Sequence, residues 1–230
     1  MFSFSRRPVV PVLRFVGPIV MATPLRPGLA LSTAAGAIEK AFTASKLSSV
    51  AILINSPGGS PVQSHLIFNR IRQLARERDK RVYVFCEDVA ASGGYFLALA
   101  GDEIYADPSS IVGSIGVISA GFGFDRAIEK LGIDRRVYTS GGTKSILDPF
   151  KPEKASDVER LKVLQRDVHE SFIGLVKERR GGRLTAPLSD FPSRLLLPKR
   201  ERGLPLLDAQ AADVGCTHDG GDRRERAQHH

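Results

Sequence analysis

The sequence has few cysteines and lacks two signatures of enzymes that need a nucleotide or a metal. Its 230 residues include only two cysteines, Cys86 and Cys216, and neither lies in a spacing typical of a disulfide framework or a zinc site. No GxxxxGK(S/T) phosphate loop and no HExxH pattern occurs. We therefore expect no cofactor and no metal, and we expect Cys86, in its apolar surroundings, to be a buried free thiol.

The chain also lacks a long uninterrupted apolar run. The apolar stretch 9–20 is broken by Pro11, Arg14, Gly17 and Pro18, so it cannot supply the roughly 20 apolar residues that a spanning helix needs. It predicts a strand, and no signal-peptide cleavage pattern follows it. We expect no transmembrane segment in this chain, and a location that is cytoplasmic or peripheral to a membrane.

The composition is that of one globular domain, with 42% hydrophobic and 25% charged residues. The net charge is +8, but the basic residues are spread along the chain, so nucleic acid is not expected as a partner. Residues 1–185 carry the predicted elements. Beyond Thr185 prolines break the pattern and the end is polar, so we expect 186–230 to be a divergent, poorly ordered tail.

Runs rich in β-branched residues alternate with helical patterns, which predicts an α/β fold. Two continuous apolar runs, Val50–Asn55 and Arg81–Cys86, are typical of neighbouring strands buried on both faces. Ser60 caps a predicted crossover helix that begins at Pro61. The other expected helices are 93–100, 125–131 and 153–180, the last with a long apolar face, and the other expected strands are 103–106, 111–119 and 136–139.

Two glycine-containing turns follow the two buried strands. The first is Asn55–Ser60 (NSPGGS) and the second is Ala90–Tyr95 (AASGGY). Ligands of open α/β sheets bind at the carboxyl ends of strands, so both turns are expected to line one site. Each also opens a helix, whose N–H groups and positive dipole end favour a developing oxyanion.

Ser92 begins the second of these helices, where a hydroxyl can be held exposed in a sharp turn. It is either a nucleophile or simply a helix cap. A serine nucleophile needs a base, and none of the five histidines lies between residues 66 and 168. A triad with His65, His169 or a histidine of the tail is therefore disfavoured, and a lysine base is the natural alternative. Lys144 follows Ser140–Thr143 (SGGT) among small and apolar residues, so we expect it to be partly desolvated.

Three separated motifs together resemble the single-domain form of signal peptide peptidase A, the S49 serine peptidases. They are INSPGGS at 54–60, ASGGYFLALAGDEIYADPSSIVGSIGV at 91–117 and SGGTKSILDPF at 140–150. The resemblance implies a ClpP/crotonase-like fold, a spiral of βαβ units. It also implies that Ser92 is the nucleophile, Lys144 the general base and Ser114 the residue that orients the lysine. The backbone amides of Gly93 and of Gly58 or Gly59 resemble the oxyanion hole.

The function implied by this resemblance is an ATP-independent serine endopeptidase that cleaves apolar peptides such as signal peptide remnants. Its partners would be peptide substrates and further copies of itself in a homo-oligomer, with peripheral membrane association possible. Members of the family commonly begin with a membrane-spanning segment and end with a GxxAxxxGLVD-like pattern. The first is not seen here, and of the second only a faint trace appears at 203–208.

Two alternatives remain open. A crotonase-like acyl-CoA enzyme would also hold an oxyanion with two amides, and Glu87 and Asp88 supply the carboxylates that such enzymes use. That chemistry leaves the Ser-Gly-Gly turn and the downstream lysine unexplained. The second alternative is a catalytically silent scaffold that binds peptides or membrane proteins, whose hallmark would be the loss of Ser92 or Lys144.

Overall fold

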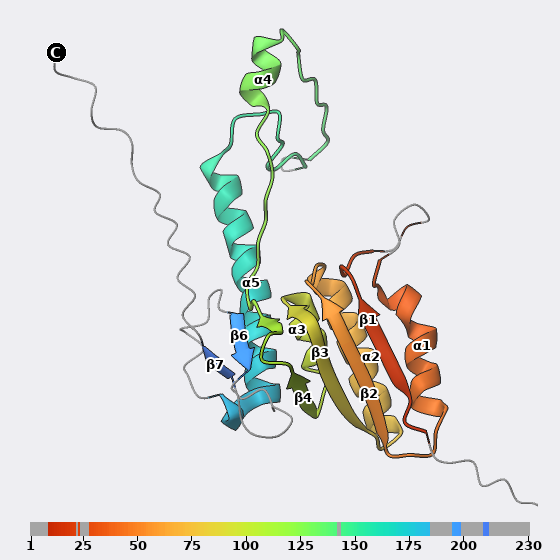
Figure 1. The fold of residues 1–230 in the computed structure, drawn as a ribbon. Coiled ribbons are helices and arrows are strands. Elements are labelled where there is room, and N and C mark those ends of the chain that lie inside the picture. Colours follow the sequence, from red (N-terminus) through yellow and green to blue (C-terminus); the bar gives the residue numbers. More distant parts are fainter. Residues whose placement is uncertain are drawn as a thin grey trace, which may run out of the picture.

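The computed structural model describes residues 9–21, 23, 28–141 and 144–184, and the backbone of two short strands beyond them. Its strands and helices alternate along most of the chain (Figure 1). The strands are β1 Val12–Val16, β2 Ser49–Ser56, β3 Arg81–Ala91, β4 Glu103–Ala106, β5 Ile111–Gly113, β6 Leu195–Pro198 and β7 Ala209–Ala211. The helices are α1 Leu31–Thr43, α2 Pro61–Glu77, α3 Gly93–Ala98, α4 Asp125–Lys130 and α5 Ala155–Arg180, which a 3-10 turn at Gly181–Arg183 follows.

One sheet joins the strands in the order β1-β2-β3-β5-β6-β7, with β4 also paired to β3. The pairings of β1 with β2, of β2 with β3, and of β3 with β4 and β5 are parallel, whereas β5–β6 and β6–β7 are antiparallel. Parallel strands need crossover connections, and α1 and α2 provide two of them. The predicted α/β architecture and the predicted pairing of the two apolar strands are therefore confirmed.

The sheet buries one face more completely than the other. Along β2, Val50, Ile52, Ile54 and Ser56 are fully buried while the residues between them are only half-buried. The expectation of burial on both faces was wrong for this strand, because a covered and a less covered face alternate along it. The buried positions join a core formed with α1, α2 and α3, and Cys86 lies in that core as predicted.

Helix α2 begins where the sequence predicts. The Ser60 hydroxyl accepts a hydrogen bond from the Gln63 N–H at 3.3 Å, and Pro61 takes the first helical position, where no backbone donor is needed. Helix α1 was not predicted. Its backbone begins at Leu31, whose N–H donates to the side-chain carbonyl of Gln63 at 2.9 Å, so α1 and α2 are tied together near their N-termini.

Helix α5 has two different halves. Its C-terminal half packs on the rest of the fold, where Phe172, Val176 and Arg180 are buried. Its N-terminal half stands clear, and Figure 1 shows it running with α4 away from the sheet. The predicted long apolar face is thus covered only towards the C-terminus, and Val163, Leu164 and Val168 are exposed.

We call residues 118–168 the arm and residues 12–117 with 169–184 the body. Among its described residues the arm contains none that is buried.

Two strand predictions fail. β5 ends at Gly113 rather than Ser119, and residues 136–139, in the arm, form no strand. At 136–139 the chain lies at the surface, Tyr138 being 92% exposed, without the neighbouring strand that a ladder requires.

Most of 186–230 lies outside the described residues, including Cys216. Only the backbones of β6 and β7 are described there, so the division into a domain 1–185 and a poorly ordered tail stays a prediction. Within the described part of the chain, none of the helices combines the length and the apolarity needed to cross a membrane.

Candidate active site

The two glycine turns meet at the carboxyl ends of β2 and β3. Gly58 has φ +93°, and a methyl group built on it would lie 2.5 Å from the Gly93 nitrogen. A methyl group on Gly93 would lie 2.5 Å from the Ser64 hydroxyl oxygen and 3.2 Å from the Gly59 nitrogen. Side chains are therefore excluded at both positions, because the two backbones pack against each other. The structure brings together the three glycines that the sequence singled out.

Ser92 occupies a strained turn between β3 and α3. Its backbone has φ +51° and ψ −120°, a conformation that costs a non-glycine residue on the order of 1 kcal/mol or more. The turn is held by hydrogen bonds on both sides: the Ser92 N–H donates to the Gly113 carbonyl at 2.7 Å, and the Ser92 carbonyl accepts from the Phe96 N–H at 2.9 Å. The Ser92 hydroxyl makes no capping bond to α3, so the helix-cap alternative does not account for it.

Ser114 lies beside Ser92 at the ends of two paired strands. Ala91 of β3 pairs with Gly113 of β5, so the next residues on each strand are Ser92 and Ser114. Ser114 also has a positive φ of +55°, and it is half-buried. Parallel neighbouring strands lie about 4.8 Å apart, so the topology places both serines at one edge of the sheet.

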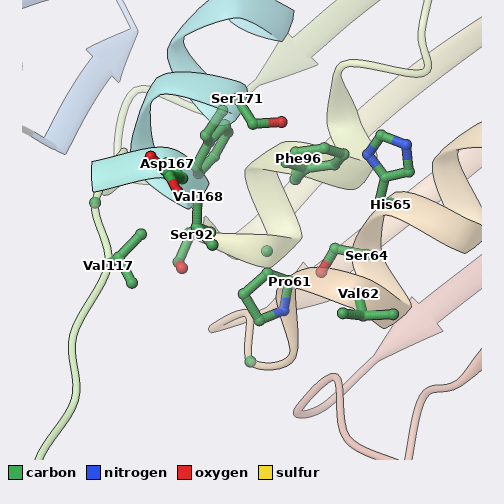
Figure 2. A pocket seen from close by; sticks show the side chains of 14 residues that line it. Pro61, Val62, Ser64, His65, Ser92, Phe96, Val117, Asp167, Val168 and Ser171 are labelled. Atoms are coloured by element: carbon green, nitrogen blue, oxygen red, sulfur yellow. The ribbon is translucent and has the colours of Figure 1, made fainter. Parts of the chain in front are cut away.

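A cavity of about 300 Å³ opens next to Ser92. Its lining is mostly apolar and comes from three helices and two loops, with Val62 of α2, Phe96 of α3, and Val168 and Phe172 of α5 among the contributors. Figure 2 shows Ser92 at one end, between Val117 and Pro61, with the Phe96 ring towards the middle. Ser92 is half-buried, and the apolar cavity is suited to receive an apolar side chain beside its hydroxyl.

Sequence analysis missed the α5 wall of this cavity. Asp167, Val168 and Ser171 line it, yet their helix begins within the arm, far along the chain from Ser92. The available signal was the helical spacing of Val168 and Phe172, which predicted an apolar face but not what that face would cover. The Phe172 ring contacts Phe96 and Tyr95, with ring centroids 5.1 and 6.5 Å apart, so α5 is packed directly on α3.

Lys144 does not lie among the residues that line the cavity. It is exposed, as is Ile146, so the expected partial desolvation by neighbouring small and apolar residues was wrong for the chain as described. The physical reason is that Lys144 belongs to the arm, which has no buried residue among those described. His65, by contrast, does line the cavity, but Figure 2 shows the Phe96 ring between its imidazole and Ser92.

The carboxylates that a crotonase-like mechanism would use are engaged elsewhere. Glu87 accepts hydrogen bonds from Arg14 at 3.0 Å, and Asp88 accepts one from the Asn55 side-chain amide at 2.7 Å. Neither residue lines the cavity. Within the described residues no cluster of three or more His, Cys, Asp or Glu side chains has the arrangement of a metal site.

The site rests on a rigid helix. All six residues of α3 are buried, and burial raises the pKa of Tyr95 to about 12, partly offset by the charge of Arg180. Burial likewise raises the pKa of Cys86 to about 12. Both groups stay uncharged at neutral pH, so they serve as packing around α3 rather than as bases.

Asp102, just after α3, ties three elements together. Its carboxylate accepts hydrogen bonds from Arg72 of α2 at 2.8 Å, from the Val82 N–H of β3 at 2.8 Å and from Arg179 of α5 at 3.4 Å. Partial burial alone would raise the pKa of Asp102, but the Val82 N–H and the two guanidinium groups outweigh it and lower that pKa. This cluster fixes α5 against the end of α3.

Two family models match the chain, and with the parallel βαβ topology they define it as an α/β protein of the Clp-peptidase type. The model of the Clp proteases matches residues 36–111, and the model of peptidase family S49 matches residues 74–187. The segment 74–187 of the chain belongs to peptidase family S49. The predicted fold class and the predicted family are thereby confirmed.

Among curated proteins, the chain is similar to segments of longer ones. It is 37% identical over 119 residues to the chloroplastic serine protease SPPA of Arabidopsis thaliana, which covers 50% of this chain and 17% of that protein. It is 62% identical over 176 residues to a Brucella melitensis protein named Na(+)/H(+) antiporter NhaA, which covers 76% of this chain and 24% of that protein. The chain thus spans about a quarter of the length of that relative, whose name describes the whole protein.

A solved structure of a ClpP1 point mutant from Listeria monocytogenes is also similar, with a TM-score of 0.44 and 15% identity. The match covers 74% of this chain and 72% of that one.

Proposed function

We propose that this chain is an ATP-independent serine endopeptidase that hydrolyses apolar peptides such as signal peptide remnants, with Ser92 as nucleophile. The observation that carries the proposal is the geometry of Ser92. Its hydroxyl is free of α3, its backbone is held in a strained turn, and it stands at the rim of an apolar cavity beside the Gly93 amide. Membership of peptidase family S49 supports the same reaction class.

In the proposed mechanism, the neutral amine of Lys144 accepts the proton of the Ser92 hydroxyl as the oxygen attacks a peptide carbonyl. The lysine then returns a proton to the departing amine when the C–N bond breaks, leaving an acyl-serine. Water, deprotonated by the same lysine, hydrolyses this ester and restores the serine. The Ser114 hydroxyl is proposed to orient the lysine amine, since it lies one strand away from Ser92.

The oxyanion is proposed to lie against the amides of Gly93 and Gly59. Both residues line the cavity together with Ser92. The Gly58 N–H already donates to the Ser56 hydroxyl at 3.2 Å, which favours Gly59 over Gly58 as the second donor. Donors fixed by packing before the reaction stabilise the charge without reorganisation, which is the larger part of such catalysis.

The position of Lys144 supports a further part of the proposal, a homo-oligomer. Lys144 is exposed to solvent, whereas the proposed base needs an apolar environment. The arm that carries it also exposes a large apolar surface, with Ile118 at 89% and Leu131 at 72%. Exposed apolar surface of this extent is typical of protein interfaces. A second copy packed on the arm would cover both the apolar surface and the lysine.

Sedimentation velocity tests this assembly. The native chain at micromolar concentration should sediment as a species heavier than its 25.0 kDa monomer. The double variant Phe122→Ser/Leu131→Ser, which removes exposed apolar groups of the arm, should shift the distribution towards the monomer. A native chain that is purely monomeric would contradict the homo-oligomer.

One observation favours a second candidate, the silent peptide-binding scaffold: Lys144 lies outside the cavity that holds Ser92.

A peptide hydrolysis assay distinguishes the serine peptidase from the silent scaffold. The native chain should cleave a short apolar peptide that has no ionisable side chain, and Ser92→Ala should abolish this cleavage. The matched control Ser109→Ala removes an exposed hydroxyl from a body turn and should leave the rate unchanged. Binding without cleavage by the native chain would favour the scaffold.

A further inference from the structure

The segment that follows β5 forms one side of the site. The Gly113 carbonyl accepts the Ser92 N–H, Ser114 has a positive φ, and the Ile115 side chain is fully buried. The next two residues, Gly116 and Val117, line the cavity. Beyond them the chain leaves the body, and Ile118 is 89% exposed. The position of this wall therefore depends on what holds residues 113–117 to the body.

One side chain from a distant element holds the middle of this segment. His169 of α5 lies 54 residues further along the chain, is half-buried, and bonds the Ile115 carbonyl through Nε2 at 3.2 Å. In the part of the chain that the structure describes, this is the hydrogen bond that joins α5 to residues 113–117. Val168 and Phe172, on either side of His169 along α5, line the same cavity.

The chemistry of the bond fixes the tautomer. A carbonyl oxygen only accepts, so Nε2 must carry the proton. An imidazolium also carries a proton on Nε2. His169 is therefore the donor in this bond.

We propose that His169 is a positioning residue for the serine peptidase site. By holding the Ile115 carbonyl, it fixes Ser114 on one side and the Gly116–Val117 wall on the other with respect to Ser92. The inference rests on the proposed function. Few other contacts can hold residues 114–117 to the body. The residues after Val117 belong to the exposed arm, and β5 ends at Gly113, just before Ser114. Without the bond, the segment is held by the Ser92–Gly113 hydrogen bond and the buried Ile115 side chain.

The test uses full-length His169→Phe, which keeps a planar ring but removes the donor, and His169→Gln, which keeps an N–H donor. Hydrogen–deuterium exchange should be faster at the amides of 114–118 in His169→Phe and near native in His169→Gln. The rate at which a fluorophosphonate probe acylates Ser92 should fall about tenfold in His169→Phe, as expected for one lost hydrogen bond, and recover in His169→Gln.

The exposed neighbour Glu170 provides the control, since Glu170→Gln should change neither readout. Native exchange at 114–118 in His169→Phe would overturn the proposal, and so would equal impairment of the Phe and Gln variants, which would assign the effect to side-chain shape. If the native chain is never acylated, the proposed peptidase function fails, and the exchange data alone decide whether His169 holds the segment.

Discussion

Large apolar side chains are buried in the body of this chain and exposed in its arm. In the body, residues from β1 to β5, α1 to α3 and the end of α5 form one continuous buried core. In the arm, none of the described residues is buried, although Phe122, Leu131, Ile133 and Tyr138 are all large and apolar. The body therefore has the means to fold alone, whereas the apolar surface of the arm is available to a partner.

The proposed site is also divided between the body and the arm. Ser92, Ser114 and the three glycines belong to the body. All of them except Gly93 have a positive φ, and Gly93 packs closely against Gly59 and Ser64. Lys144 belongs to the arm and is exposed. The strained backbone of Ser92, the proposed nucleophile, is held by hydrogen bonds within the body. Lys144, the proposed base, instead depends on a partner that covers the arm and shields the lysine from solvent.

The largest effect is expected from removing Lys144, the proposed base in the arm. Lys144→Arg keeps a long cationic side chain, but an arginine stays protonated and cannot accept the serine proton. We expect kcat/KM for an apolar peptide to fall by about a thousandfold, within the range typical of a lost general base. Lys151→Arg, also on the exposed arm, is the control and should keep native activity. Near-native activity of Lys144→Arg would assign the base to another residue, with His65 the first to be tested.

A matched pair of leucines compares the two regions in stability. Leu74 on α2 is 1% exposed and Leu131 in the arm is 72% exposed. Leu74→Ala should lower the free energy of unfolding by about 3 kcal/mol, because it leaves a cavity in the core. Leu131→Ala should change it by less than about 0.5 kcal/mol when the chain is monomeric. Urea unfolding at low protein concentration measures both, and equal losses would mean that the arm is packed on the body.

A smaller effect is expected at Asp102, with a defined pH dependence. Its pKa is lowered in the folded chain, so the folded state binds fewer protons and the stabilisation is present above the ordinary carboxyl pKa. It is lost as the pH falls below about 4 and through the lowered value. Asp102→Asn should cost about 2 kcal/mol at pH 7, and the difference from the native chain should shrink at acidic pH.

The arm offers the control for this ion cluster. Asp134 and Arg136 lie 3.6 Å apart with exposed side chains, and such pairs contribute little. Asp134→Asn should therefore leave the unfolding free energy nearly unchanged at every pH. A difference between Asp102→Asn and the native chain that stays constant down to pH 3 would show that the carboxylate charge is not what stabilises this cluster.

How much the sequence predicts also differs between body and arm. The strands around Val50 and Arg81, the helix at Pro61 and the glycine turns were predicted because local signals and burial agree there. Helix α1 was missed, because no clear cap marks its start: Ala30 occupies the cap position without a capping side chain. The strand predicted at 136–139 failed because its β-branched and aromatic residues have no strand beside them.

The candidate site was predicted only where local sequence signals specify the structure. Ser92 and the glycines are fixed by short turns next to predicted strands, so the sequence pattern carries their position. Ser114 lay inside the predicted strand 111–119 and was singled out only by the family resemblance. The cavity wall of Val168 and Phe172, and the bond from His169 to Ile115, depend on how α5 returns to the body after the arm. Tertiary packing decides that return, and helical periodicity alone does not specify it.

The central claim is that the body presents Ser92 as an activated nucleophile, and intact-mass measurement after reaction with a serine-directed acylating probe tests it most directly. The native chain should gain the mass of one adduct, fragmentation should locate the adduct on Ser92, and Ser92→Ala should gain none. An adduct on another serine, or equal labelling of the native chain and Ser92→Ala, would contradict the account.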